Sequence, residues 1–450
     1  MKLLAETPDR LNLERLIDDE VQGDYIYMYP PRQAYRTMDK ERLTGLIHAS
    51  TSDARNQPVN LYFHFPFCRQ ICGFCNLYSV TARPEEAYSD YISLLALEMH
   101  HWAPLIAGRT IDTIYLGGGT PSILPLEQLD RCLANIELAL GTTRVSIPEI
   151  AIEVAPDTVD EVKLRGMREI GITRVNLGLQ TTSDEGLHQI GRRHGFSLAR
   201  KRIEDALGCG FDNVCVDLIY GLPQQTPEAW QTTVRDVLAF GAPTVCAYPL
   251  TLRPNTGFAR KHLTLVGAEQ YRKYEMARQM FIDAEYTQQT HVRYIVPGVG
   301  GYRQKTNHWA GQDIIGIGAG ARGYLRSCDY RNGYSIQRRR SALESYQENI
   351  SRGEISFNAG FELNTDERMR RQAILGLIDL DRTQFLNEFG IDVVDYFADQ
   401  FAELSRLNLA NITSERVQLT ERGRKFRDLI VQMFFSDDVW RRIREFDYME

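Results

Sequence analysis

The chain has 450 residues, of which 43% are hydrophobic, enough for a main domain of roughly 250 to 330 residues and a smaller one. The formal net charge of −7 comes from charges of both signs spread along the sequence, so we expect no basic face for nucleic acid or an anionic membrane. No secretory signal and no run of 18 apolar residues occurs. We therefore expect a globular cytoplasmic protein whose partners are small molecules.

Residues 1–55 are predicted to form an N-terminal arm that precedes the first strand. This arm contains YIYMYPPRQAYR at positions 25 to 36, which is rich in tyrosine, proline and arginine. Two interpretations remain open for this segment. It either packs on the main domain or covers a substrate.

From about Asn60 to Leu250 the sequence alternates short apolar runs with longer helical patterns. The runs lie at 60 to 65, 112 to 116, 149 to 154, 174 to 179, 213 to 221 and 244 to 250. This spacing is typical of successive βα units with parallel strands, either in a barrel or in a doubly wound sheet.

An unusual residue or segment lies at or near the carboxyl end of each run. These are, in order, Cys68, the GGGTP segment at 117 to 121, Glu153, Gln180, Asp217 and the stretch from Tyr248 to Thr251. Barrel enzymes build their sites at the carboxyl ends of their strands. The coincidence therefore predicts one shared site and favours the barrel.

After about Asn358 the pattern changes to helices and two short strands, ending in NITSERVQLTERGRKFRDLIVQMFF. This order predicts a small winged-helix-like domain at 358–450, which leaves a barrel with an extension at 56–357. Winged helices often bind DNA, but acidic residues near the end of the chain argue against that here. These acids are Asp437, Asp438, Glu445, Asp447 and Glu450. We expect a lid or packing role instead.

The segment FPFCRQICGFCN places three cysteines, Cys68, Cys72 and Cys75, within eight residues. A structural zinc site needs four ligands, so it would have to borrow a residue such as His64, and this alternative stays open. A [4Fe-4S] cluster instead has four iron corners, three of which such a loop can hold. The fourth iron is then open to a small chelating ligand, such as the amino and carboxylate groups of an amino acid.

The other five cysteines are scattered singly along the chain. They are Cys132, Cys209, Cys215, Cys246 and Cys328. In a cytosolic chain we expect them to be reduced packing residues.

The pattern C-x-x-x-C-x-aromatic-C after a first strand, with GGGTP after the second, resembles the radical S-adenosylmethionine (SAM) superfamily. More closely, YFHFPFC, YLGGGTPS, EIAIEV, NLGLQ, VDLIYGLPQQT and IGIGAGARGYL in this order resemble the oxygen-independent coproporphyrinogen III oxidase family and its relatives. The resemblance covers roughly residues 25 to 450. It implies an α/β fold: a partial (β/α)6 radical SAM barrel with an N-terminal arm and a C-terminal winged-helix-like domain.

The same resemblance implies a [4Fe-4S] cluster and two SAM molecules at the carboxyl mouth of the barrel. It assigns the cluster to Cys68, Cys72 and Cys75. It assigns the cluster-bound SAM to Tyr62, Gly118, Glu153 and Arg322. It assigns a second SAM to Phe74, Gly119, Thr120, Gln180, Arg192, Asp217 and Thr251. Glycines admit close approach of the backbone to a ligand, and an arginine can hold a carboxylate in a fork. Singly, Glu153 or Asp217 could instead cap a helix, and Gln180 could bond a loop.

The glycine segment GAGARG at 318 to 323 matches the pattern G-x-G-x-x-G of dinucleotide-binding folds. The residues that follow it, YLRSCDYRNGYS, do not form the helix and second strand that such a fold requires. We therefore expect no nicotinamide cofactor.

Reductive cleavage of SAM in this superfamily yields a radical that abstracts hydrogen, and the protein holds the reacting atoms in place. Family members use it to decarboxylate porphyrin propionates, to transfer a methyl or methylene group from a second SAM, or to open haem anaerobically, and others are haem-binding chaperones. Three departures favour class C methyl transfer or cyclopropanation at an sp2 carbon in natural-product or antibiotic biosynthesis. Asn76 and Leu77 replace the oxidases' further cysteine, YPLTLRPNTGFAR follows the sixth strand, and GIGAGARGYL resembles the methyltransferase-like branches. Porphyrin decarboxylation, haem opening and the chaperone remain alternatives.

Several polar residues near the barrel exit are candidates for further roles that spacing alone does not assign. Tyr248, His291 and Tyr294 are candidate bases, and His308 is a candidate haem ligand for the chaperone alternative. The cluster also implies an electron donor such as flavodoxin or ferredoxin.

Overall fold

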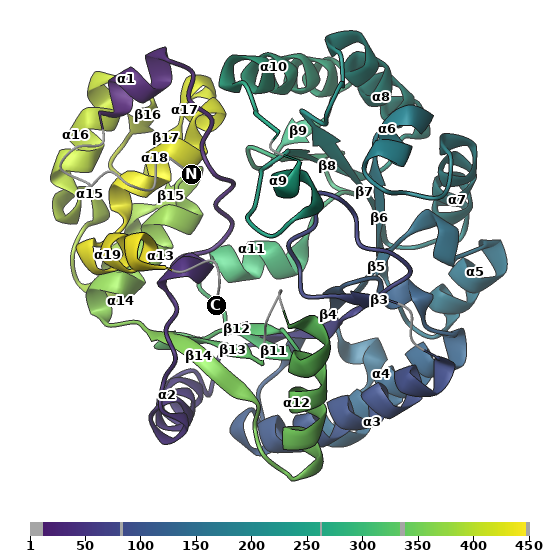
Figure 1. Ribbon diagram of the computed structural model, residues 1–450. Coiled ribbons are helices and arrows are strands. Elements are labelled where there is room, and N and C mark those ends of the chain that lie inside the picture. The colour runs from purple at the N-terminus through teal and green to yellow at the C-terminus, as the bar shows by residue number, and fades with distance from the viewer. Residues whose placement is uncertain (1–11, 82–83, 262, 334–337, 447–450) are drawn as a thin grey trace.

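The computed structural model describes residues 12–81, 84–261, 263–333 and 338–446. A twelve-stranded sheet forms the main part of the fold (Figure 1). Six parallel strands form its centre: β1 (Val59–Phe65), β4 (Ile111–Gly118), β5 (Glu149–Val154), β6 (Arg174–Gln180), β7 (Asn213–Tyr220) and β8 (Thr244–Pro249). Each predicted apolar run therefore coincides with a strand to within two residues.

Further strands extend both edges of this centre. On one side β11 (Ile314–Ile317) lies parallel to β1, and antiparallel strands β12 (Arg322–Tyr324), β13 (Cys328–Asn332) and β14 (Phe357–Glu362) follow it. On the other side β10 (Arg293–Ile295) and β9 (Thr287–Gln288) continue antiparallel from β8. These edge strands are not predicted from the sequence, because most of them are too short to show an alternating pattern.

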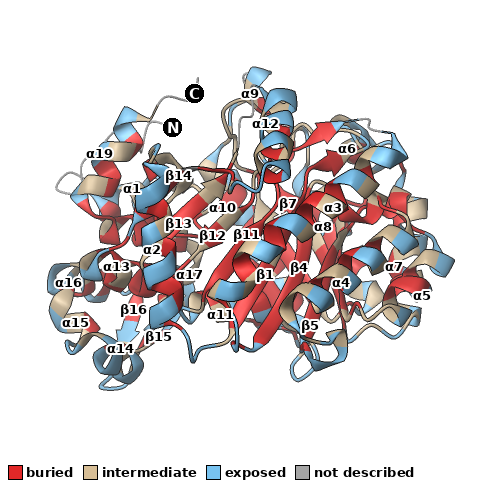
Figure 2. Cartoon of the chain, turned by 90° about the horizontal axis from the view of Figure 1, so that it is seen from below, coloured by how far each residue is buried: buried red, intermediate tan, exposed pale blue. Residues whose placement is uncertain are grey.

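Helices cover the outer face of the central strands. They are α3 (Glu85–Trp102), α4 (Leu126–Leu140), α5 (Glu161–Glu169), α6 (Asp184–Gln189), α7 (Phe196–Gly208), α8 (Pro227–Phe240) and α10 (Gly267–Asp283), with α12 (Arg339–Ser351) beside α3. In Figure 2 the strands are buried, whereas the helices expose their outer sides. All eight residues of β4 are buried, as is usual for a parallel strand covered by helices.

Two short helices lie at opposite ends of the barrel. The carboxyl end holds α9 (Gly257–Arg260) and a small ladder, in which β2 (Phe67–Cys68) pairs with β3 (Val80–Thr81) beside the cysteine loop. The amino end holds α11 (Arg303–Trp309), where Asn307 bonds to Asn60 and Asp112 at the starts of β1 and β4. The strand register pairs Tyr62 with Tyr115 and Asp217 with Cys246. It thereby brings side chains from separate motifs to neighbouring positions.

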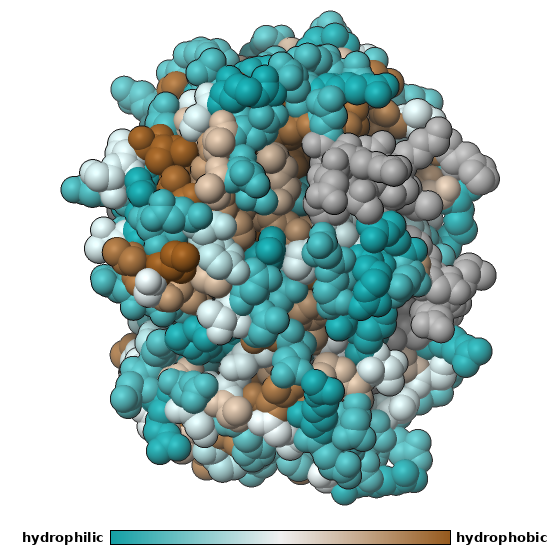
Figure 3. Space-filling view, turned by 90° about the vertical axis from the view of Figure 1, so that its left-hand side faces the viewer, coloured by the Kyte–Doolittle hydropathy of each residue, from teal (hydrophilic) through white to brown (hydrophobic). Residues whose placement is uncertain are grey.

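The C-terminal part combines helices with a small sheet of order β15-β17-β16. The helices are α13 (Thr365–Gly376), α14 (Arg382–Phe389), α15 (Val393–Tyr396), α16 (Ala398–Arg406), α17 (Glu421–Lys425), α18 (Arg427–Ile430) and α19 (Asp437–Glu445). The strands are β15 (Asp379–Asp381), β16 (Ala410–Ile412) and β17 (Arg416–Leu419). The sequence predicts two short strands here, and the structure has three. The outer face of this C-terminal part is largely hydrophilic, with hydrophobic residues in small separate groups (Figure 3).

The N-terminal arm packs against this C-terminal part. The arm carries α1 (Leu13–Asp18) and α2 (Lys40–Asp53), and Leu13, Ile17 and Tyr29 belong to the hydrophobic cluster of the C-terminal helices. The division of the chain at residues 55/56 and 357/358 stays a prediction.

The α/β fold class with a partial (β/α)6 barrel and a C-terminal domain is confirmed. Among the described helices, none combines the length and apolar character needed to cross a membrane. Of the acids that argued against DNA binding, Asp447 and Glu450 lie outside the described residues.

Candidate functional site

The cysteine loop follows β1 and is fixed by backbone hydrogen bonds to distant segments. The Gly73 N–H donates to Ile190 O at 3.0 Å, and the Phe258 N–H donates to Gly73 O at 2.8 Å. A Cβ atom at Gly73 would lie 2.7 Å from the Phe258 ring, so a side chain there would disturb this seat. Cys68, Cys72 and Cys75 are half-buried free thiols in this loop.

The glycine segment after β4 packs directly on the same loop. The Gly119 N–H donates to Phe65 O at 2.7 Å and the Thr120 N–H to Phe67 O at 2.8 Å. A Cβ atom at Gly119 would lie 2.6 Å from Phe67 O and 2.9 Å from Cys68 Sγ. Only glycine fits there, because two backbone segments and a sulfur meet at this position.

The donor set fits a [4Fe-4S] cluster better than zinc. His64 does not supply a fourth zinc ligand, because its Nδ1 is 3.0 Å from Tyr62 Oη and its Nε2 is 2.8 Å from Tyr78 O. Burial raises the pKa of Cys68, and that of Cys75 to about 12, so these thiols favour the protonated form unless a metal binds the sulfur and displaces the proton. Three cysteines in a short loop match three corners of the cluster.

The residues assigned to the cluster-bound SAM lie together. Glu153 accepts hydrogen bonds from the Gly118 N–H and from Tyr115 Oη, both at 3.1 Å. The Tyr62 ring stacks on Tyr115 with centroids 5.9 Å apart. Burial raises the pKa of Glu153 to about 7. Arg322 lies on β12 and contacts Tyr27 and Met28 of the arm.

The residues assigned to a second SAM form a neighbouring group. A Cβ atom at Gly178 would lie 2.9 Å from Gln180 Nε2 and 3.2 Å from Arg192 Nη2, so both side chains crowd this glycine. Gln180 has a φ of 73°, a left-handed conformation that redirects the chain at the end of β6. Arg192 Nε and Thr251 Oγ1 are buried without a hydrogen-bond partner among the described residues. Such orphaned polar atoms fit a site that receives a polar ligand.

The remaining members of that set border the cluster loop and the barrel interior. Thr120 Oγ1 lies 3.6 Å from Cys68 Sγ. Phe74 packs on the apolar cluster that contains Leu187 and Phe258, and Asp217 lines the central cavity.

A cavity of about 430 Å³ occupies the carboxyl mouth of the barrel. The arm contributes residues 24–28 and 31–33 to its wall, and the C-terminal part contributes Phe435 and Ile443. The arm therefore both packs on the protein and covers the site. Tyrosines are prominent in the lining: Tyr25, Tyr27, Tyr62, Tyr78, Tyr115, Tyr248, Tyr302 and Tyr324. Arginine side chains join them, Arg32, Arg253, Arg322 and Arg331, together with Lys305, whose pKa is lowered by burial to about 7.

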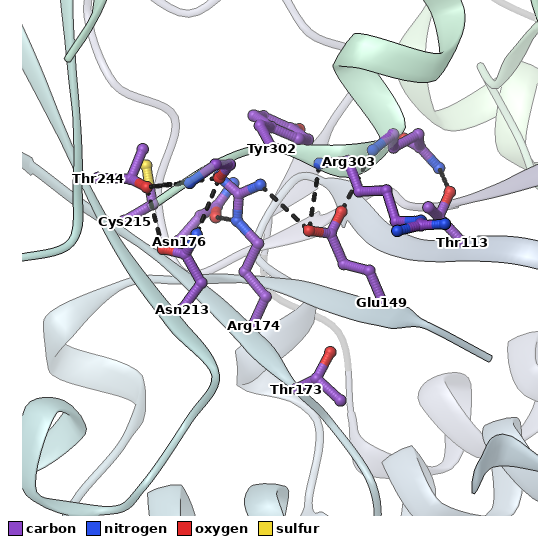
Figure 4. Close-up of polar contacts among 12 residues, drawn as sticks. Thr113, Glu149, Thr173, Arg174, Asn176, Asn213, Cys215, Thr244, Tyr302 and Arg303 are labelled. Carbon is purple, nitrogen blue, oxygen red and sulfur yellow. Dashed lines mark hydrogen bonds and ion pairs between the residues drawn. The ribbon is translucent and has the colours of Figure 1, made fainter. Parts of the chain in front are cut away.

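A polar layer lies beneath the cavity, inside the barrel (Figure 4). Arg174 Nε donates to Asn176 Oδ1 at 2.9 Å, and the guanidinium carbon lies 3.8 Å from the centre of the Tyr302 ring. Glu149 lies 3.5 Å from Arg174 and accepts from the Arg303 N–H at 3.3 Å. The layer positions Tyr302 and Asn176 in the cavity wall.

Of the four candidate residues for further roles, two line the cavity and two do not. Tyr248 lines the cavity, and His308 lines it from α11 with its Nε2 buried and without a hydrogen-bond partner among the described residues. His291 lies behind the wall, 3.4 Å from Asp428, and Tyr294 stacks on Phe281 away from the cavity.

Part of the cavity wall lies outside the sequence motifs. Tyr302 and Lys305 are single residues that only the fold brings to the wall. Tyr115 and Tyr324, by contrast, belong to the YLGGGTPS and IGIGAGARGYL segments.

Two family models match the chain. A model of the radical SAM superfamily matches residues 62–237, and a HemN C-terminal domain model matches residues 363–426. The superfamily implies a [4Fe-4S] cluster and SAM, and the cysteine loop fits the former. The solved structure of coproporphyrinogen III oxidase (HemN) from Escherichia coli superimposes with a TM-score of 0.78 at 22% identity, over 92% of this chain and 99% of that one. That likeness shows the fold alone.

Comparison with curated relatives shows which family of the superfamily the chain belongs to. The heme chaperone HemW of Haemophilus influenzae is 30% identical over 273 residues, which cover 60% of this chain and 70% of that protein. The oxygen-independent coproporphyrinogen III oxidase of Salmonella typhimurium is 26% identical over 396 residues, or 82% of this chain and 83% of that protein. The chain belongs to the radical SAM superfamily and, within it, to the HemN/HemW family.

Proposed function

We propose that the chain is a radical SAM enzyme of the HemN/HemW type whose substrate is a tetrapyrrole that carries carboxylate side chains. The lining of the 430 Å³ cavity carries this proposal, since tyrosines and cationic side chains surround it next to the cysteine loop. Tyrosine faces pack against a planar ring system, and guanidinium groups bind carboxylates in pairs of hydrogen bonds. Relatives named as a coproporphyrinogen oxidase and as heme chaperones support the same substrate class.

The favoured methyl or methylene transfer in antibiotic biosynthesis is not supported by the comparisons. The two relatives described above are a HemW chaperone and a coproporphyrinogen oxidase, which favours reading the three sequence departures as variations within that family. Asn76, which follows the last cysteine of the loop, lines the cavity. We therefore favour the alternative reaction, oxidative decarboxylation, over methyl or methylene transfer.

For the cofactors, the proposal assigns the cluster to Cys68, Cys72 and Cys75. It assigns the cluster-bound SAM to Tyr62, Gly118, Glu153 and Arg322. It assigns a second SAM to Phe74, Gly119, Thr120, Gln180, Arg192, Asp217 and Thr251. The buried, unpartnered atoms Arg192 Nε and Thr251 Oγ1 support the second set. When bound, the cluster and SAM supply one-electron chemistry that abstracts hydrogen from the substrate.

The chain's own residues bind the substrate and exclude water. Arg253, which follows β8, and Arg322, which lies on β12, bring positive charge to the cavity wall for the carboxylates. Phe435, Ile443 and the arm cover the mouth of the barrel. Burial by these segments lowers the local dielectric constant, which strengthens the hold of the cations on the carboxylates.

An acidic electron carrier such as flavodoxin or ferredoxin fits the outer side of the cysteine loop. A second cavity of about 290 Å³ lies beside Cys72 and Cys75, and Arg260 and Arg339 border it. Arg260 is exposed, so its charge is available to attract an acidic partner.

The test is turnover under anaerobic conditions. The reconstituted full-length protein is given reductant, SAM and coproporphyrinogen III, and the products are analysed by mass spectrometry. We expect 5′-deoxyadenosine together with a product that has lost carbon dioxide and two hydrogens from a propionate, which leaves a vinyl group. S-adenosylhomocysteine as the main product would instead restore methyl transfer.

A haem-binding chaperone is the second candidate, and His308 favours it. Its buried Nε2 has no hydrogen-bond partner among the described residues, and burial holds the pKa of the imidazole well below its usual value. A neutral imidazole on a cavity wall is a ready ligand for iron. In a haem titration without SAM, His308→Ala should weaken binding about tenfold relative to the wild type, while the exposed-helix control His100→Ala should not. Tight haem binding with no SAM cleavage would favour the chaperone over the enzyme.

A further inference from the structure

A row of hydrogen bonds inside the barrel leads from a buried arginine to the carboxylate of Glu153. Arg174 Nε donates to Asn176 Oδ1 at 2.9 Å, and Asn176 Nδ2 donates to Tyr115 Oη at 2.8 Å. Tyr115 Oη in turn lies 3.1 Å from Glu153 Oε1. The row spans the adjacent strands β4, β5 and β6. We refer to Arg174, Asn176 and Tyr115 as the donor row, and none of them is among the residues proposed to hold a cofactor.

The hydrogens of the donor row point in one direction while Glu153 is ionised. A guanidinium group has donors and no acceptor, so Arg174 fixes the carbonyl oxygen of Asn176 toward itself and the amide nitrogen toward Tyr115. That nitrogen donates, so the hydroxyl oxygen of Tyr115 accepts and its own hydrogen is available to Glu153. Burial and the charge of Glu153 raise the pKa of Tyr115 well above its usual value, so the hydroxyl keeps this hydrogen.

The ring of Tyr302 contacts both ends of the donor row. It stacks on Tyr115 with centroids 5.7 Å apart and planes inclined by 14°, and the guanidinium carbon of Arg174 lies 3.8 Å from its centre. Figure 4 shows Arg174 linked to Asn176 on one side and to Glu149, at 3.5 Å, on the other. Glu149 offsets the charge of the buried guanidinium group. These contacts fix the ring of Tyr115 and therefore the place of its hydroxyl group.

Two donors hold the Glu153 carboxylate and leave room for a ligand. The Tyr115 hydroxyl contacts one of its oxygens and the Gly118 N–H the other, both at 3.1 Å, and Glu153 lines the cavity. A carboxylate has about four lone-pair sites, so acceptor capacity remains. We propose that the donor row is a set of positioning residues, which holds Glu153 as an oriented hydrogen-bond acceptor for the cluster-bound SAM. This inference rests on the proposed assignment of Glu153 to that SAM.

Other titratable groups near Glu153 do not replace the donor row. The charge of Glu153 acts on Tyr62 of β1, on Asp217 of β7 and on Tyr302. Burial raises the pKa of all three groups, so the two tyrosines stay protonated and neutral. In the part of the chain that the structure describes, only the Tyr115 hydroxyl and a backbone N–H donate to Glu153. The donor row is therefore its side-chain support.

The first test measures the pKa of Glu153 in the full-length chain without cofactors. Its carboxyl carbon, labelled with ¹³C, is followed by NMR across neutral pH and identified by its loss in Glu153→Gln. Tyr115→Phe removes the donor but keeps the ring, so the pKa of Glu153 should rise by about 1, a tenfold change in proton affinity. Tyr286→Phe is the matched control, since it removes another buried tyrosine hydroxyl, which donates to Ala242 O at 2.8 Å. An unchanged pKa in Tyr115→Phe would overturn the proposal.

Asn176→Asp reverses the donor row while keeping its shape. Beside Arg174 an aspartate is ionised and only accepts, so the hydroxyl hydrogen of Tyr115 turns toward it and away from Glu153. The pKa of Glu153 should rise by about 1 or more when Tyr115 is present, and by clearly less in the Tyr115→Phe background. Equal rises in both backgrounds would mean that the new charge acts alone, which contradicts the donor row. If Asn176→Asp does not fold, Tyr115→Phe and its control still decide.

SAM binding then tests what the donor row does for the cofactor. SAM is titrated onto the reconstituted, unreduced cluster, and the Mössbauer spectrum reports only the SAM that chelates iron. Tyr115→Phe and Asn176→Asp should each weaken this binding about tenfold with iron content unchanged, whereas Tyr286→Phe should not. Wild-type SAM affinity in both variants would overturn the positioning role. Wild-type affinity in Glu153→Gln would instead contradict the proposed cofactor assignment itself.

Discussion

The cofactor side of the site and its outer wall are built in different ways. On the cofactor side, short backbone hydrogen bonds such as Gly119 N–H to Phe65 O at 2.7 Å fix residues that lie at the ends of adjacent strands. The outer wall is held by contacts between remote segments, such as Ile26 N–H to Asp428 Oδ1 at 3.2 Å. This difference indicates that backbone hydrogen bonds hold the cofactor-binding residues rigidly. The outer wall, which would contact the substrate, is instead built from side chains that can change independently of one another.

Removing a cluster ligand should have the largest effect and should leave the outer wall intact. Cys75→Ala is expected to abolish the cluster, because only two of three thiolates remain in the loop. The measurement is iron and sulfide content after anaerobic reconstitution. Cys209→Ala is the control with an unchanged number of ligands, and a full cluster in Cys75→Ala would refute the assignment.

A methyl group at the junction of the two backbone segments should have the next largest effect. Gly119→Ala would place a Cβ atom 2.6 Å from Phe67 O, and the resulting shift should destabilise the protein by about 1 to 3 kcal/mol and reduce cluster content. Gly45→Ala is the control, because a Cβ atom there meets nothing within 4 Å. Equal melting temperatures for the two variants would show that the cofactor side is not rigid.

The pKa of Glu153 gives a prediction on the pH dependence of stability. The folded value is raised by burial to about 7, from 4.5. Between these values the folded state holds a proton that the unfolded state has lost, so the free energy of unfolding falls as pH rises from about 4.5 to 7, by about 3 kcal/mol. Glu153→Gln should remove this part of the fall, measured by urea denaturation without cofactors at pH 5 and pH 8. Parallel curves for both proteins would mean that Glu153 is ionised throughout.

On the outer wall we expect the smallest effect. Arg253→Gln removes one charge from the cavity, and it should raise the KM for a porphyrinogen about tenfold, or about 1.4 kcal/mol, with cluster content unchanged. Arg200→Gln is the control, because Arg200 is an exposed partner of Glu204 on α7. Loss of the cluster in Arg253→Gln would show that the two sides are not separable.

The predictable part of the molecule is the part in which neighbours in space follow one another in the sequence. The six central strands, the cysteine loop and the glycine segment after β4 can be predicted because each is a continuous pattern with its own periodicity or spacing. The edge strands and the cavity wall cannot, since Tyr27, Tyr302 and Tyr324 come from separate segments. Cys215 and Cys246 look isolated because a helix separates them, and only the register of β7 with β8 joins them.

The contact between the arm and the C-terminal helices has a consequence for biosynthesis. Ile26 bonds to Asp428, a residue 402 positions further along the chain. On the ribosome this anchor of the arm is therefore missing until long after the strands β1 to β8 have emerged. We expect the mouth of the barrel to lack this cover during that interval. A chain truncated before Asp428 would lose the anchor of the arm together with Phe435 and Ile443 of the cavity wall.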